Sequence, residues 1–117
     1  MGMYRTVIPI TGDGTVTMDS RETGFVAAVE WVVGTLGGTV DAVFSVVNAP
    51  SGVNRTLLTL TNASANAVYP VRRLESDNGG TTLATYTYDI LDGSLRVVTT
   101  QTAGAATAGT AVVYWFD

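Results

Sequence analysis

Two pairs of carboxylates are the residues of this 117-residue chain that most suggest chemistry. Glu75 and Asp77 lie in the segment ESDNGG beside Asn78, and Asp89 and Asp92 flank a turn in YDILDG. Carboxylates facing across a cleft perform glycoside hydrolysis, and oxygen ligands at alternate loop positions suit Ca²⁺. Neither segment has the full ligand number of a calcium loop, and Asp, Asn and Gly favour turns by themselves. We therefore expect turns here, with no metal site and no cofactor.

The side chains that usually carry catalysis are missing from the composition. The chain has no His and no Cys, which removes the Ser-His-Asp triad, most zinc sites and thiolate chemistry. All six basic residues are Arg, so neither a Schiff base nor a phosphate-loop lysine is available. A small domain of short turns also offers little wall for a substrate cleft. We expect no catalytic residue and no enzyme.

The charge and hydropathy of the chain limit the classes of partner that it can bind. Ten acidic and six basic residues give a net charge of −4, and an acidic chain lacks the basic face that binds phosphates, so we expect no nucleic acid. Residues 1–20 lack a secretory pattern, and no apolar stretch approaches the roughly 20 residues of a membrane span, so we expect cytoplasmic synthesis and no membrane. Only 14% of residues are charged, against about 25% in typical soluble domains. This scarcity predicts that a partner covers part of the outer surface.

The elements that must position these residues are strands, because alternation with a period of two dominates and helical periodicity is hard to find. Strands are predicted at residues 4–10, 15–18, 25–33, 40–47, 53–61, 67–74, 81–90, 95–100 and 110–116. We expect the second to pair with the first across the TGDGT turn. About eight or nine short strands separated by Gly and Asn turns predict one domain over residues 1–117, an antiparallel β-sandwich of jelly-roll or immunoglobulin-like type.

Two segments carry position-specific signals. Pro70 cannot donate a ladder hydrogen bond, so the strand that contains it is expected at an edge or a bulge. AGAATAGT, residues 103–110, lacks the lysine of a phosphate loop and does not precede a helix. Its small residues lie between two predicted strands, which favours a loose hairpin loop. Whether the strand after it is central or at an edge stays open.

Two predicted strands are apolar on both faces. In FVAAVEWVV only Glu30 interrupts the apolar run, and nothing interrupts AVVYWF. Alternation places these residues of the first strand on one face: Phe25, Ala27, Val29, Trp31 and Val33. A sandwich normally leaves one face of each sheet polar, so such strands need a cover. Tolerated surface apolar groups are the other interpretation, but the low charge favours burial in an oligomer.

Five residues are candidates for that interface. Arg72 and Arg73 are neighbours on a strand and point to opposite faces. One is expected to pair with an inner carboxylate, while the other, beside Tyr69, anchors a partner or is simply solvated. Tyr114 and Phe116 are a docking site if the last strand is an edge.

Trp31 and Trp115 permit two interpretations. Sugars stack on exposed aromatic faces, so the pair is compatible with a glycan-binding module. Both lie on strongly apolar strands, which favours a place in the core, more firmly for Trp31 than for Trp115 near the strand end.

The order of these segments resembles a group of small all-β proteins encoded among the virion genes of tailed bacteriophages. Its members carry an opening hairpin, a "TLTN…YPR"-like middle and a closing strand–"AGxxxxGT"–strand segment. Here these correspond to Asp13-Gly14 in ITGDGTVTM, to Leu60–Arg72 and to Ala103–Thr110, so the resemblance covers nearly the whole chain. Members often carry a lysine in the last loop, where this chain has Ala106, Thr107 and Ala108.

The resemblance implies a virion structural protein, most plausibly a decoration or cement protein on the capsid surface. Its partners would then be the major capsid protein and further copies of itself, expected as a homotrimer. A glycan-binding module of a head or tail fibre, and a ring-forming tail-tube or neck component, are the alternatives.

Overall fold

The computed structural model describes residues 2–18, 23–76, 79 and 82–117, and these residues form strands and turns with no helix. The strands are β1 (Met3–Thr11), β2 (Gly14–Met18), β3 (Gly24–Val32), β4 (Asp41–Val47), β5 (Arg55–Leu60), β6 (Ala67–Pro70), β7 (Arg73–Ser76), β8 (Thr82–Thr87), β9 (Asp89–Leu91), β10 (Ser94–Thr100) and β11 (Ala108–Phe116). The all-β prediction is confirmed. Residues predicted as two long strands, 67–74 and 81–90, each divide into two shorter ones that join different sheets.

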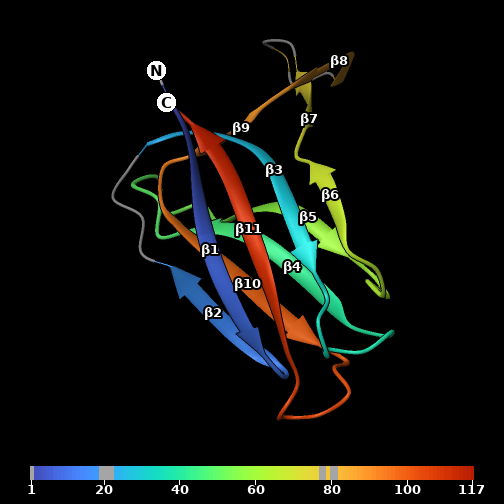
Figure 1. Cartoon of the computed structure of the whole chain (residues 1–117). Helices are drawn as coiled ribbons and strands as arrows, with labels where there is room; N and C mark the ends of the chain where they lie inside the picture. Colours follow the sequence, from blue (N-terminus) through green and yellow to red (C-terminus); the bar gives the residue numbers. More distant parts are fainter. Residues whose placement is uncertain (1, 19–22, 77–78, 80–81) are drawn as a thin grey trace.

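Two antiparallel sheets pack face to face (Figure 1). The front sheet has the order β1-β11-β3-β6, with β9 also paired to β3, and the back sheet has the order β2-β10-β4-β5. The pairs β4–β5, β3–β6, β2–β10 and β1–β11 are nested along the chain and alternate between the sheets. This nested arrangement is a jelly roll, which decides between the two predicted sandwich types. β7 and β8 form a separate two-stranded ribbon.

The core lies between the sheets and is built from the inward residue of each alternating pair. Trp31 on β3 meets Phe44 on β4 edge to face, with 6.2 Å between ring centroids. The Trp31 indole N–H donates a 3.1 Å hydrogen bond to the carbonyl of Ala63, so the burial leaves this donor satisfied. The other large, fully buried side chains are Ile8, Ile10, Leu36, Leu91, Leu95, Val26, Val29, Val40, Val46 and Val71.

Two segments predicted as hairpin turns, at Gly12-Asp13 and at AGAATAGT, are instead connections that pass from one sheet to the other. β1 pairs with β11 and β2 with β10, so the Gly12-Asp13 turn carries the chain from the front sheet to the back. The loop before β11 carries it from back to front, so the hairpin predicted for AGAATAGT is also wrong. These two passages lie against each other: the Gly12 N–H donates to the Thr107 carbonyl at 2.9 Å, and the Asp13 carboxylate accepts from the Thr102 N–H at 2.9 Å and hydroxyl at 2.7 Å.

A β-bulge at Ala27 changes which residues of β3 face outward. Tyr114 is opposite Ala28, but Trp115 is opposite Val26, so Ala27 is an extra residue on β3. The extra residue turns Val26 into the core and leaves Phe25 43% exposed. The prediction that Phe25 shares the face of Trp31 is therefore wrong, because strict alternation does not continue through the bulge.

Pro70 lies where its chemistry predicts. It is the last residue of β6, at the edge of the front sheet, so its missing N–H costs no ladder hydrogen bond. β11, by contrast, is central between β1 and β3, which answers the question that the sequence left open.

A candidate interaction face on the front sheet

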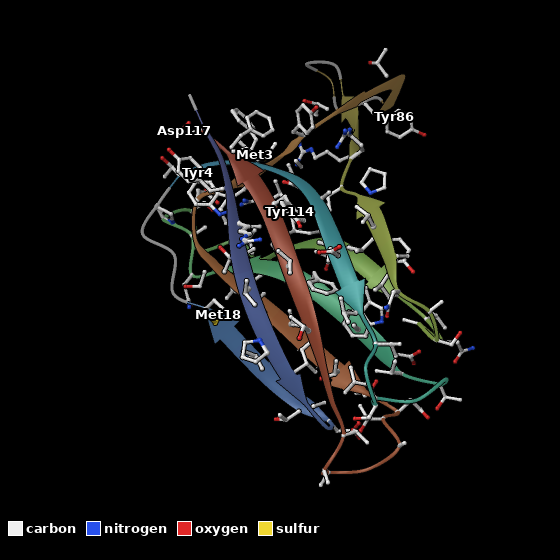
Figure 2. All side chains as sticks on the ribbon, viewed as in Figure 1. Met3, Tyr4, Met18, Tyr86, Tyr114 and Asp117 are labelled. Atoms are coloured by element: carbon white, nitrogen blue, oxygen red, sulfur yellow. The ribbon has the colours of Figure 1, made fainter. Side chains whose placement is uncertain are left out.

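The strand registers arrange the outward side chains of the front sheet in four rows, which together we call the outer face. Cα partners across the sheet define the rows: Met3–Phe116–Phe25–Ile90, Arg5–Tyr114–Ala28–Pro70, Val7–Val112–Glu30–Val68, and Pro9–Thr110–Val32. The residues between the rows face the other way, and Ile8, Val29 and Val113 among them are fully buried, whereas Tyr4 near the end of the sheet is 44% exposed. Figure 2 views the molecule from this side, with Tyr114 toward the C-terminal end of β11. β3 and β11, the two strands that are apolar on both faces, are thus neighbours.

The outer face is apolar and nearly uncharged. All of its side chains except Arg5, Glu30 and Thr110 are apolar or aromatic, and several are strongly exposed: Met3 63%, Val68 60%, Ile90 50%, Val7 49%. Monomeric proteins rarely expose a contiguous apolar patch of this extent unless a partner covers it.

The two charges of the outer face lie on either side of the central strand β11. Between them, the Tyr114 hydroxyl donates a 3.1 Å hydrogen bond to the Glu30 carboxylate. This hydrogen bond, desolvation and the negative charge of Glu30 raise the pKa of Tyr114 above its ordinary value, while the charge of Arg5 lowers it slightly. Tyr114 therefore remains a neutral donor. Arg5 has no ion-pair partner among the described residues.

The outer face of the back sheet has the opposite character. Its registers give the rows Thr17–Arg96–Ser45–Thr56 and Thr15–Val98–Val43–Thr59. Hydroxyl groups dominate these rows, and the four threonines are exposed, as expected for a sheet face in water, whereas Ser45 is buried. The contrast between the two outer faces indicates that the front sheet alone is built for burial.

An aromatic cluster lies at the end of the outer face that contains Phe25 and Phe116. The Phe116 ring lies 5.5 Å from that of Phe25 and 4.9 Å from that of Tyr88, and the Arg72 guanidinium lies 4.2 Å above the Tyr88 ring. Arg72 also donates to the carbonyl of Ala27 at 3.0 Å, so the bulge fixes the cation over the ring.

The structure brings together three of the five predicted interface residues. Tyr114, Phe116 and Arg72 lie on or beside the outer face, although β11 reaches it as a central strand and not as an edge. Tyr69 faces the opposite way and packs, half-buried, against the core. Arg73 lies 3.8 Å from the buried carboxylate of Asp89, the pairing expected for one arginine of the two.

Several residues of the outer face were not predicted from the sequence, among them Met3, Val7, Val68 and Ile90. Alternation shows that such residues lie on the face opposite the core, but only the register places them in common rows. The apolar character of both faces of β3 and β11 was the sequence signal that pointed to this sheet.

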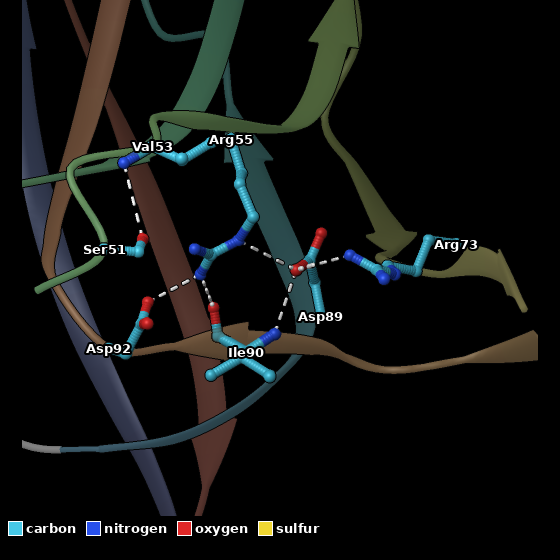
Figure 3. A network of polar contacts seen from close by, with 7 residues as sticks. All are labelled: Ser51, Val53, Arg55, Arg73, Asp89, Ile90 and Asp92. Carbon is cyan, nitrogen blue, oxygen red and sulfur yellow. Dashed lines mark hydrogen bonds and ion pairs between the residues drawn. The ribbon is translucent and has the colours of Figure 1, made fainter. Parts of the chain in front are cut away.

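Asp89 and Asp92 are one of the two carboxylate pairs that the sequence offers for catalysis or calcium binding. In the structure both form ion pairs with arginine side chains (Figure 3). Arg55 donates to Asp92 at 2.6 Å and to the Ile90 carbonyl at 2.7 Å, and its Nε lies 3.5 Å from the Asp89 Oδ1. The Asp92 hydrogen bond is the main reason that the pKa of Arg55 is raised. Asp89 also accepts from the Ile90 N–H at 2.9 Å. This arrangement is an ion-pair network that joins the sheets.

The other carboxylate pair tests neither the turn expected there nor the calcium interpretation. Asp77 and Asn78 lie outside the described residues, and so does the side chain of Glu75. Elsewhere, within the described ranges, no three His, Cys, Asp or Glu residues are grouped as metal ligands would be.

Both tryptophans belong to the core. Trp31 is fully buried and Trp115 is 7% exposed, stacked on Tyr4 with 4.6 Å between ring centroids. Neither offers an open ring face to a sugar. The described residues also contain no helix long and apolar enough to span a membrane.

Comparison with solved structures finds distant structural likenesses. No protein-family model and no curated protein sequence matches the chain. A carbohydrate-binding module (CBM32-3) from a family 31 glycoside hydrolase of Clostridium perfringens is similar over 98% of this chain and 75% of its own, with 11% identity and a TM-score of 0.47. The infectious bursal disease virus Gx strain structure is similar over 98% of this chain and 32% of its own, with 15% identity and a TM-score of 0.37. Both TM-scores are below 0.5.

Proposed function

We propose that this chain is a non-enzymatic structural protein of a virion, which binds the outside of a tailed-phage capsid and stabilises it. The observation that carries the proposal is the outer face of the front sheet, an apolar surface with one positive and one negative charge. Such a surface gains free energy by packing against another protein, at roughly 25 cal/mol for each Å² of apolar surface removed from water.

The proposed mechanism is the bridging of neighbouring capsomers. Each copy would contribute weak apolar and backbone contacts, and the symmetry of the shell would multiply them. The chain has no Lys, so clamping through a lysine isopeptide bond is not available to it and the bridging is non-covalent. Its partners are the major capsid protein and further copies of itself, on the capsid surface, after synthesis in the bacterial cytoplasm.

The buried tryptophans weigh against a glycan-binding module. A sugar site built on tryptophan needs an exposed indole platform, and Trp31 and Trp115 both face the core. A tail-tube or neck role predicts a ring, which native mass spectrometry of the purified protein detects as a hexamer or dodecamer.

The decoration role is tested on expanded shells assembled from the major capsid protein encoded in the same genome. The purified chain is added, bound protein is measured by co-sedimentation, and the melting temperature of the shells is recorded. We expect saturable binding and a higher melting temperature. The decoration role would be refuted if the shells do not bind the chain and their melting temperature does not rise.

A further inference from the structure

We propose that a second copy of this chain covers the outer face of the front sheet, in a two-fold, face-to-face dimer in which Arg5 of each copy pairs with Glu30 of the other. This inference rests on the part of the proposed function that makes this face an interface between copies of the chain, so that contacts with the capsid would come from other surfaces of the dimer. It does not depend on the capsid.

The positions of the two charges make the outer face complementary to itself. Arg5 on β1 and Glu30 on β3 lie on opposite sides of β11, in adjacent rows. A two-fold axis parallel to β11 in the plane of the interface places β1 of one copy over β3 of the other. Arg5 then lies within one row, about 7 Å along the strand, of the partner copy's glutamate. Sheets that pack face to face are about 10 Å apart, a gap that two long side chains can cross.

Burial of the charges favours a second copy over an uncharged partner. Arg5 has no ion-pair partner within the described part of the chain, and Glu30 accepts one hydrogen bond, from Tyr114. A wholly apolar partner would bury the Arg5 cation unpaired, which is costly. The two-fold dimer pairs both charges twice, once on each side of its axis, around a centre formed by Val112 and Tyr114 of the two copies.

The size of the outer face fits a reversible dimer. Four strands at the usual spacing and about eight residues at the usual rise measure about 19 by 27 Å. Treated as flat, two such faces bury about 1,000 Å² in total, which is near the lower bound of specific interfaces. Protruding side chains add to this area. A pair that dissociates on dilution is the expected result.

The experiment measures dimer dissociation by analytical ultracentrifugation over a dilution series of the full chain. We expect a concentration-dependent dimer for the wild type. Arg5→Glu and Glu30→Arg each place like charges opposite one another, so each should raise the dissociation constant about tenfold or more. The double variant Arg5→Glu/Glu30→Arg restores opposite charges and should recover most of the wild-type affinity.

Two controls keep the result interpretable. Thr17→Arg adds a charge to the outer face of the back sheet and should leave the dissociation constant unchanged. Urea unfolding of every variant shows whether it is folded, and Glu30→Gln, which keeps the oxygen that accepts from Tyr114, replaces Glu30→Arg if the latter does not fold.

Three results would overturn the dimer: a wild type that stays monomeric at the highest concentration, a trimer insensitive to both charge changes, and a double variant as dissociated as the single ones. The trimer is the oligomer that the resemblance to phage virion proteins implies, and it requires two different surface patches. If the dimer forms as described while capsid shells do not bind the chain, the decoration role fails and the dimer stands. If shells bind a chain that remains monomeric in solution, the dimer fails and the decoration role stands.

Discussion

Arg55 and Asp89 come from opposite sheets of the sandwich, and the Arg55 Nε lies 3.5 Å from the Asp89 Oδ1. Asp89 is the more deeply buried, with 8% of its side chain exposed against 21% for Arg55. A carboxylate so far from water requires a cation or several hydrogen-bond donors. This contact therefore fastens β9, and the β7–β8 ribbon that precedes it, to the back sheet.

Removing the Arg55 guanidinium should be strongly destabilising. Arg55→Met keeps most of the apolar stem but leaves Asp89 and Asp92 without their main partner, and we expect a loss of about 3 kcal/mol in the free energy of unfolding. Arg73→Ala is the matched control, since Arg73 is 57% exposed and lies 3.8 Å from Asp89. Its loss should be about 0–1 kcal/mol. Urea denaturation measures both, and equal losses would contradict the role given to Arg55.

Asp13 should make stability depend on acid. The N–H and then the hydroxyl of Thr102 donate to its carboxylate, and these hydrogen bonds lower the pKa of Asp13 below its ordinary value of 3.8. A carboxyl with a depressed pKa in the folded state stabilises the protein above the unfolded pKa, and this contribution is lost as the pH falls through the folded value. Asp13→Asn should therefore be less stable than the wild type at pH 7.

The difference between the Asp13→Asn variant and the wild type should shrink as the pH falls below about 4. Urea midpoints recorded from neutral to strongly acidic pH measure it. Thr102→Val keeps the backbone hydrogen bond, which is the larger cause of the lowered pKa, and loses the hydroxyl, so carbon-detected NMR should show the pKa of Asp13 rising part of the way toward 3.8. A stability gap that is constant across the pH range would contradict this linkage.

The two glycines of the segment AGAATAGT should respond differently to alanine. A Cβ on Gly109 would lie 2.5 Å from the Leu36 Cδ1 and 2.8 Å from the Val32 carbonyl oxygen, whereas one on Gly104 meets nothing within 4 Å. Gly109→Ala should cost about 1–3 kcal/mol from overpacking. Gly104→Ala should stay within about 0.5 kcal/mol of the wild type. Thermal and urea unfolding check this, and the idea fails if the costs are similar.

The tryptophans should be shielded from solvent. With Trp31 fully buried and Trp115 7% exposed, acrylamide should quench the native fluorescence weakly and the unfolded fluorescence strongly. Trp31→Phe and Trp115→Phe separate the two contributions. Trp31→Phe should also cost about 1–3 kcal/mol, because the Ala63 carbonyl loses its donor. Strong quenching of either indole in the native protein would contradict its burial and would favour the glycan-binding module again.

The fold class and much of the core follow from local sequence pattern. Alternation is a local property, since neighbouring side chains of a strand point to opposite faces. It placed Val29 and Trp31 on the same face and singled out β3 and β11 as apolar on both faces, and the missing N–H of Pro70 predicted an edge or a bulge. The absence of His, Cys and Lys limits the chemistry that the chain can perform, whatever its fold.

The choice of neighbouring strands, by contrast, belongs to the tertiary structure. Pairing follows from packing between segments far apart in the chain, so nothing near residues 15–18 indicates that they pair with β10 and not with β1. A single extra residue at Ala27 reverses the faces of Phe25 and Val26, and no local pattern marks it. The outer face, with Arg5 and Glu30 on either side of β11, exists only because those registers bring distant residues into common rows.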